Sequence, residues 1–352
     1  MRRHRRSRIG RSRLVVGAVC ATLFLGAFRF SGFNDPKARA AAATATTWLD
    51  GQQQTDGGFE VAGFPGFETP DAVLAIAENA QTTKKWNAAT ALAAVQAVKT
   101  KGHTALHALD NLADGGIDAG QAAKIVVLDA KPLGLSTRSF NPDGDSKSVD
   151  LNAVIDAAAA PDGSYGAFNA TLYAAIALRL LTGSVPANTV AYIRAAQQAN
   201  GGWNFAGDPT GTDLDIDTTG LAIQALVAAQ VAPTDTALRA ALVLLAAQQQ
   251  STGAWQAFGS DDPNSTSVAT VAITASGFDP TKACWRDVVD PGLAGNPYVS
   301  PIVWIRSRQQ PDGHIASPND SFGVNTFAST QSIEALRRGW VPVKPLGRQP
   351  CP

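Results

Sequence analysis

A short pattern of glutamine, glycine and a following aromatic or aliphatic residue recurs along this chain and constrains its fold more than any other feature. The most complete copy is "QQANGGW" at 197–203. Three further copies with glutamine stand at 52–59, 248–255 and 308–314, and two shorter glycine turns without glutamine stand at 114–117 and 162–165. Glycine permits the positive backbone angles that reverse a chain at a helix end, and the glutamine side chains can bond to backbone groups of the turn. Each copy therefore predicts the turn of a helical hairpin.

The spacing of the copies, about 40 to 60 residues, is that of an array of helical hairpins. An open array needs polar caps at both ends, and the sequence shows none. We therefore predict an all-α fold, a single closed (α/α)6 toroid of six hairpins over residues 41–352, with a central cavity. Residues 132–149 form a polar, Pro- and Gly-containing insert, predicted as a surface loop. Residues 341–352 form a C-terminal tail.

The first forty residues differ from the rest and are predicted to be a signal peptide. Seven arginines between residues 2 and 13 precede an apolar run at 14–28, which is short for a membrane span. Ala38-Arg39-Ala40 has the form of a cleavage site. The alternative is a signal that is retained as a membrane anchor. We expect an exported protein, secreted or attached to the cell surface.

Cleavage after residue 40 would leave an acidic chain. Residues 1–40 hold 10 of the 29 basic and 1 of the 29 acidic residues, so the remainder carries 19 basic and 28 acidic groups, net −9. This charge argues against binding to nucleic acid or to an anionic membrane surface. Cys284 and Cys351 remain after cleavage, and an oxidising compartment favours a disulfide between them that ties the tail to the last repeats.

The repeats resemble the Gln/Trp repeats of squalene cyclases and of prenyltransferase β subunits. The resemblance rests on "QQQTDGGF", "QQANGGW", "QQQSTGAW" and "RQQPDGH", and it covers nearly all of the chain after residue 40. The same toroid hosts cyclases, zinc prenyltransferases and cobalamin carriers, so the resemblance implies a fold rather than one activity. His103, His107 and His314 do not match the zinc ligands of the prenyltransferases together with Cys284. We therefore expect no metal, no cofactor and no protein prenylation.

One motif resembles the Asp-x-Asp-Asp-Thr motif of squalene cyclases and related class II terpene cyclases. It is "DIDTT" at 215–219, and by this resemblance Asp217 is the acid and Asp215 its partner. Thr218 replaces the last aspartate, and its hydroxyl can donate a hydrogen bond to Asp217. Two departures argue against a cyclase: the chain has room for only one helical domain, and few aromatic residues fall on the inner helices. Tyr173 and Phe327 are the main candidates.

The alternative interpretation of these acids is structural. Polar residues that favour helix N-termini open most of the predicted inner helices, so Asp215, Asp217 and Thr218 are equally explained as caps and dipole partners. In a closed ring these helix starts meet at one cavity mouth, which is a plausible small-molecule site. The ligand-binding candidates are Glu68, Asp213, Thr218, Asn169, Tyr173, Asn264, Asn325 and Phe327.

Three functions remain open from the sequence. The first is an exported toroid that binds or processes a hydrophobic, isoprenoid-like molecule in its cavity, with class II cyclase-like protonation by Asp217. The second is a non-catalytic carrier similar to the cobalamin-binding toroids. The third is a carbohydrate-active toroid in which Glu68 or Asp71 faces Asp217. We expect a monomer whose partner is a hydrophobic small molecule. The aromatic residues of the turns, and stripes such as "LAIQALVAA" at 221–229, are predicted to be packing surfaces.

Overall fold

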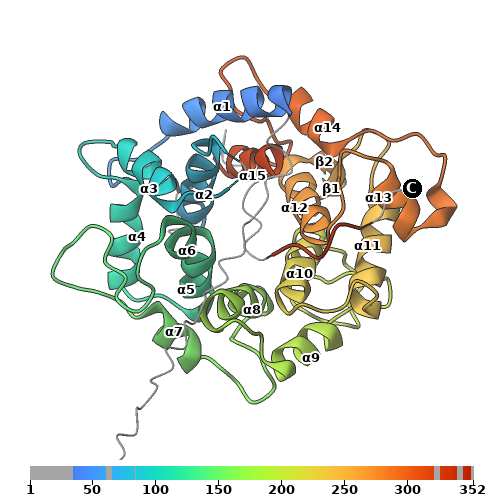
Figure 1. The fold of residues 1–352 in the computed structure, drawn as a ribbon, viewed down its shortest axis with the longest axis horizontal. Helices are drawn as coiled ribbons and strands as arrows, with labels where there is room; N and C mark the ends of the chain where they lie inside the picture. Colours follow the sequence, from blue (N-terminus) through green and yellow to red (C-terminus); the bar gives the residue numbers. More distant parts are fainter. Residues whose placement is uncertain (1–34, 61–65, 84, 321–325, 339–343, 350–352) are drawn as a thin grey trace, which may run out of the picture.

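Helices arranged as two concentric rings make up the molecule, as Figure 1 shows. The computed structural model describes residues 35–60, 66–83, 85–320, 326–338 and 344–349. Within these ranges one two-stranded sheet accompanies the helices. The fold is all-α, and the predicted toroid is confirmed.

The inner ring consists of one helical segment from each hairpin. Its members are α2 (Thr69–Asn79), α5 (Ala119–Ile125) with the π-helical segment Val126–Ala130 and α6 (Lys131–Leu133), α8 (Phe168–Thr182), α10 (Ile216–Ala228), α12 (Pro263–Ala275) and α15 (Phe327–Arg337). Each packs against the next, and α15 packs against α2, so the first and last repeats close the ring (Figure 1).

The outer ring is less regular than the inner one. Its members are α1 (Pro36–Asp50), α3 (Ala88–Ala97), α4 (Ala105–Asp114), α7 (Leu151–Ala157), α9 (Ala187–Ala195), α11 (Thr236–Gln248), α13 (Cys284–Val289), a 3₁₀ turn (Pro291–Leu293) and α14 (Pro301–Ser307). The second and sixth outer layers are thus divided into shorter helices, where the sequence predicted one helix per layer. A hairpin of β1 (Trp255–Ala257) and β2 (Ser260–Asp262), which the sequence did not predict, leads into α12.

The glutamines of the repeat make the backbone contacts that the sequence predicted. The side-chain amide of Gln197 donates to the carbonyl oxygen of Gly201 at 2.7 Å, and that of Gln309 donates to Gly313 at 3.0 Å. The Gln309 amide also lies 2.8 Å from the carbonyl oxygen of Ala41, so it joins the last turn to α1. Gly201 has a φ of 92°, which a residue with a side chain rarely adopts.

A second recurring contact ties each turn to the inner helix that follows it. The backbone N–H of Trp203 donates to the Thr219 hydroxyl at 3.0 Å, and that of Trp255 donates to Thr266 at 2.9 Å. Both tryptophan side chains are fully buried, and their indole N–H groups bond to the preceding outer helix. The prediction that these aromatic residues pack in the fold is confirmed.

The structure describes part of each end of the chain for which the sequence made a prediction. Helix α1 begins at Pro36 and contains the predicted cleavage point at residue 40, with Ala38 buried. Residues 1–34 lie outside the described ranges, so cleavage and export stay predictions. The tail returns to the last repeats, because the backbone N–H of Leu346 donates to the carbonyl oxygen of Ala275 at 2.9 Å.

Cys351 also lies outside the described residues, so its disulfide with Cys284 stays a prediction. Among the described helices, none has the length and apolar character needed to span a membrane.

Candidate functional site

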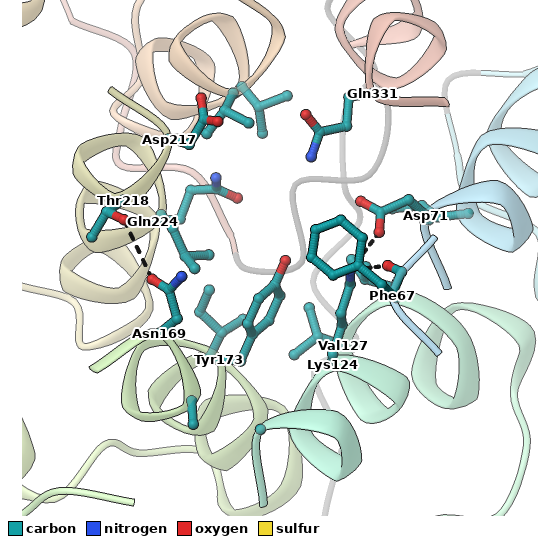
Figure 2. A pocket seen from close by; sticks show the side chains of 18 of the residues that line it. Phe67, Asp71, Lys124, Val127, Asn169, Tyr173, Asp217, Thr218, Gln224 and Gln331 are labelled. Atoms are coloured by element: carbon teal, nitrogen blue, oxygen red, sulfur yellow. Dashed lines mark hydrogen bonds and ion pairs between the residues drawn. The ribbon is translucent and has the colours of Figure 1, made fainter. Parts of the chain in front are cut away.

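A cavity of about 540 Å³ lies between the inner helices, as Figure 2 shows from close by. Its wall combines aliphatic and aromatic side chains with amide and charged ones, and most of its exposed surface is apolar. The residues that the following description uses are Phe67, Asp71, Lys124, Asn169, Tyr173, Asp215, Asp217, Thr218, Gln224, Phe327, Gln331 and Glu334. The cavity therefore has a mainly apolar surface that also carries polar groups from several inner helices.

The first residues of α10 form one polar part of the wall. Asp215 caps this helix: its Oδ1 accepts the backbone N–H of Asp217 at 2.9 Å, as the structural alternative predicted. Its Oδ2 accepts the Thr218 hydroxyl at 2.7 Å, and the side-chain oxygen of Asn169 lies 3.4 Å from the same hydroxyl. The expectation that Thr218 donates to Asp217 was wrong, because the cap turns Asp215 toward this hydroxyl.

Asp217 is not a cap, and its surroundings favour the neutral acid. Its Oδ1 is buried and has no hydrogen-bond partner among the described residues. Burial first, and then the charge of Asp215, raise the pKa of Asp217 to about 7, although a side-chain hydrogen bond with Ser265 lowers it in part. A substantial fraction of Asp217 is therefore protonated at neutral pH, in a carboxyl group that borders an apolar cavity.

A buried ion pair forms the opposite part of the wall (Figure 2). The ammonium group of Lys124 on α5 lies 2.6 Å from Asp71 Oδ2 on α2, and it donates to the carbonyl oxygen of Phe67 at 2.6 Å. Both side chains are almost fully buried. Burial of the lysine lowers its pKa. The negative charge of Asp71 and, to a smaller extent, a hydrogen bond with Asp71 outweigh this effect and keep the pKa of Lys124 above its usual value.

Three aromatic rings surround this ammonium group. Its nitrogen lies 4.9 Å from the ring centre of Phe67 and 5.9 Å from the ring centres of Tyr173 and Phe327. The Phe67 and Phe327 rings also contact one another, with centres 4.9 Å apart. Aromatic faces attract cations. Tyr173 and Phe327 do line the cavity, and in this structure both face a lysine.

Two further acids lie close to this ion pair. Asp129, in the π-helical segment, is fully buried, and neither of its carboxyl oxygens has a hydrogen-bond partner among the described residues. Glu334 on α15 lines the cavity. Burial, followed by the charge of Asp71, raises the pKa of both acids well above its usual range. This shift favours the neutral form of both acids.

Some predicted ligand-binding residues lie outside the cavity lining. Glu68 accepts a hydrogen bond from the hydroxyl of Thr326, and burial raises the pKa of Glu68 to about 7. Asp213 is exposed and accepts the side-chain amide of Asn204 at 2.9 Å. Asn264 donates to Gln331 at 3.2 Å, so it supports a residue of the wall. Asn325 lies outside the described residues.

Other residues of the wall were not identified from the sequence. Lys124, Gln331 and Glu334 were not singled out, and Gln224 falls in a stripe that we predicted to be a packing surface only. The available signal was an isolated polar residue inside an apolar helical stretch, as in "AAKIVVLDA" at 122–130. Burying such a residue is unfavourable unless it has a partner, so it points to a site.

Known proteins resemble this chain in fold, whereas the two comparisons by sequence found no match. No family model matches this sequence, and no curated protein matches it. A variant of type II terpene cyclase MstE from Scytonema, in complex with geranylgeranyl dihydroxybenzoate, is similar with a TM-score of 0.59 and 13% identity over 87% of this chain and 98% of that chain.

Two further solved structures share the fold. Another MstE variant, in complex with merosterolic acid A, has a TM-score of 0.57 and 13% identity over 87% of this chain and 97% of that chain. A protein from Actinoplanes has a TM-score of 0.53 and 17% identity over 86% of this chain and 99% of that chain.

These matches establish a terpene cyclase-like toroid as the fold of this chain, because they span nearly all of each matched chain. They also correct one expectation. The room for only one helical domain was counted as an argument against a cyclase, yet almost the whole MstE chain corresponds to the one toroid described here.

Proposed function

We propose that this chain is a terpene cyclase-like enzyme in which Asp217 donates a proton to an isoprenoid chain held in the central cavity. The observation that carries the proposal is the buried Oδ1 of Asp217, which has no hydrogen-bond partner among the described residues and belongs to a carboxyl group whose pKa is raised to about 7. A general acid must be protonated and must reach its substrate, and the raised pKa of Asp217 and its place in the cavity wall support both conditions.

The proposed reaction is an isomerisation. The O–H bond of Asp217 breaks, a new C–H bond forms at one carbon of an alkene, and the cation that results closes one or more rings through the remaining double bonds. Loss of a proton from the last cation gives a product with the mass of the substrate. Asp215 holds the start of α10 in place, and its negative charge helps to keep the proton on Asp217.

Three lines of support go beyond Asp217 itself. The wall of the cavity is mainly apolar, which suits an isoprenoid chain. The Lys124–Asp71 pair and Asp217 belong to opposite parts of the wall, so a substrate with one polar end would have a preferred orientation. The fold is that of solved cyclases, one of which was determined with geranylgeranyl dihydroxybenzoate. Export through residues 1–40 remains part of this proposal.

A non-catalytic carrier is the second candidate, and one observation favours it. The three aromatic rings around Lys124 already face an ammonium group, so they are less available to stabilise a carbocation. Binding of a hydrophobic ligand needs no such stabilisation. The carbohydrate-active alternative has less support, because Asp71 is paired with Lys124 and Glu68 does not line the cavity.

Incubation of the purified full chain with geranylgeraniol and with geranylgeranyl dihydroxybenzoate tests the proposal. We expect gas or liquid chromatography with mass spectrometry to reveal a product of unchanged mass and altered retention. Asp217→Asn should lower product formation by about 10³-fold or more while ligand binding, measured by calorimetry, persists. The rate should fall as pH rises through about 7, because only protonated Asp217 is active.

Asp213→Asn is the matched control, since it makes the same change four residues away at an exposed carboxylate outside the cavity. Its product yield should equal that of the unchanged chain. Binding without product in the unchanged chain would support the carrier instead. Product that survives Asp217→Asn would remove Asp217 as the acid.

A further inference from the structure

Three carboxylates meet on the outside of the toroid, away from the central cavity. Asp143 and Asp145 belong to the loop between α6 and α7, and Asp110 belongs to the outer helix α4. One oxygen of each carboxylate lies within 4.8 Å of the others. The loop that carries Asp143 and Asp145 falls in the insert at 132–149, which the sequence assigned to the surface and to no function.

Two of the acids at this place are buried without a full set of partners. Asp110 is 2% exposed, and its Oδ1 has no hydrogen-bond partner among the described residues. Asp114, one turn further along α4, has a side chain that is 10% exposed and an Oδ1 that is likewise unpartnered there. Burial of a carboxylate oxygen without a donor or a cation is costly. One oxygen of Asp110 lies in the cluster, and the Asp110 carboxyl group forms a side-chain hydrogen bond with Asp143 there.

Positive charge near these four carboxylates is small in the described structure. The ammonium group of Lys147 lies 3.8 Å from Asp114 and is largely exposed. The ring of His107 lies 2.7 Å from Asp143 through its Nδ1, and Asn111 lies against its other nitrogen at 2.9 Å. A lysine at the edge and one histidine leave a negative excess, which a bound cation would balance.

The kind of ligand atoms and their exposure indicate which cation would bind. All three clustered ligands are carboxylate oxygens, which hard cations prefer. Asn141, Asp143 and Asp145 alternate along the loop, as the first three ligands do in an EF-hand, although Ser146 stands where an EF-hand has glycine. Two of the three ligands are exposed, so water can complete an irregular shell. Irregular shells of six to eight oxygens suit Ca²⁺ better than Mg²⁺.

We propose that Asp110, Asp143 and Asp145 bind one calcium ion, which fastens the 132–149 loop to the outer helix α4. This site is separate from the central cavity and from the proposed protonation, and it departs from the expectation of a chain without metal. It does not use His107 as a ligand, because both ring nitrogens of His107 have partners within the protein.

Calorimetric titration of the chelator-treated full chain with CaCl₂ tests this site. We expect one ion per chain with a Kd on the order of 10⁻⁴ M, as in extracellular modules. Calcium at about 100 times the Kd should raise the Tm by about 4 °C, and the same concentration of Mg²⁺ should raise it much less.

The double variant Asp143→Asn/Asp145→Asn should lose both the heat of binding and the Tm shift. Asparagine keeps acceptor oxygens for the backbone N–H groups of Asp145 and Lys147, so the loop keeps these two hydrogen bonds. The matched control is Asp162→Asn/Asp208→Asn, two exposed loop acids with similar local bonds and the same change in charge. It should bind calcium normally. Absence of binding in the unchanged chain, or equal binding by both double variants, would overturn the proposal.

Discussion

Two carboxylates on opposite sides of the central cavity, Asp217 and Asp71, have contrasting surroundings (Figure 2). Asp71 is 3% exposed and lies 2.6 Å from the ammonium group of Lys124. The groups that act most on Asp217 are instead the carboxylate of Asp215 and the hydroxyl of Ser265. One wall therefore holds a buried ion pair, and the other holds an acid whose surroundings raise its pKa. Burial alone does not decide what a carboxylate does; the charge beside it does.

Under the proposed function, this contrast would separate substrate binding from proton donation within one cavity. The Lys124 wall offers a polar anchor and aromatic faces, while the Asp217 wall offers a proton. A substrate that spans the cavity would meet the two walls at different points along its length. The following predictions test the two walls separately.

The largest expected effect comes from breaking the ion pair. Lys124→Met leaves Asp71 buried without its cation, and loss of one partner of a buried pair costs about 3–5 kcal/mol of unfolding free energy. Chemical denaturation at pH 8 measures this loss. The double variant Asp71→Leu/Lys124→Met should recover most of it, because both charges are gone.

Lys147→Met is the control for that experiment. Lys147 is also a lysine near an aspartate, but its side chain is 66% exposed and its ammonium group lies 3.8 Å from Asp114. Surface pairs of this kind contribute about 0–1 kcal/mol. A loss at Lys124 as small as the loss at Lys147 would mean that the two walls do not differ as described.

The next effect is a pH-dependent gain in stability at the other wall. The folded-state pKa of Asp217, about 7, lies above its usual 3.8, so the folded protein holds a proton there that the unfolded chain has lost between these values. The free energy of unfolding therefore falls as pH rises through this window. Asp217→Asn removes this cost, so it should be neutral near pH 4 and stabilising by up to about 4 kcal/mol at pH 8.

Urea denaturation of both chains at pH 4, 6 and 8 gives this comparison directly. Other acids with raised pKa, such as Glu68, are present in both chains and cancel in the difference. A difference that does not change with pH would contradict the assignment of a raised pKa to Asp217.

The smallest effect concerns the residue that replaces the last aspartate of the motif. Thr218→Val keeps the shape of the side chain and removes the hydroxyl that donates to Asp215. Loss of a hydrogen bond to a charged group should cost about 1.5 kcal/mol. Thr210→Val removes a similar bond to Asp208 on the exposed loop and should change stability by less than about 0.5 kcal/mol. Equal melting temperatures for the two variants would show that the Thr218 contact contributes nothing specific.

The sequence pointed to the Asp217 wall of the cavity but not to Lys124 on the opposite wall. "DIDTT" drew attention to Asp215 and Asp217 because it resembles the Asp-x-Asp-Asp-Thr motif of class II terpene cyclases. Lys124 escaped notice because a single lysine in a helix is most often a surface residue. Its burial depends on α5 facing α2 and α8 at the same time, and helical periodicity does not predict which face of an inner helix points into the cavity.

The sequence also did not predict which of the residues at the starts of the inner helices line the cavity. Asn169 and Thr218 line the wall, whereas Asn264 and Asp213 do not, although all four lie near the start of an inner helix or in the spacer before it. In the fifth repeat the cap is Asp262, two residues before the Asn264 that the sequence suggested, and it accepts the backbone N–H of Asn264 at 2.8 Å. A shift of two residues rotates a helical side chain through more than half a turn.

The sequence by itself determined the repeating hairpin and hence the toroid, because each turn is built from local contacts. Gln197 bonds to Gly201 four residues later, and Trp203 bonds to the helix that follows it. Only the tertiary structure decided the chemistry of the cavity. The Lys124–Asp71 pair and the burial of Asp217 bring together helices from different repeats, and electrostatic free energies depend on those distances and on the exclusion of water.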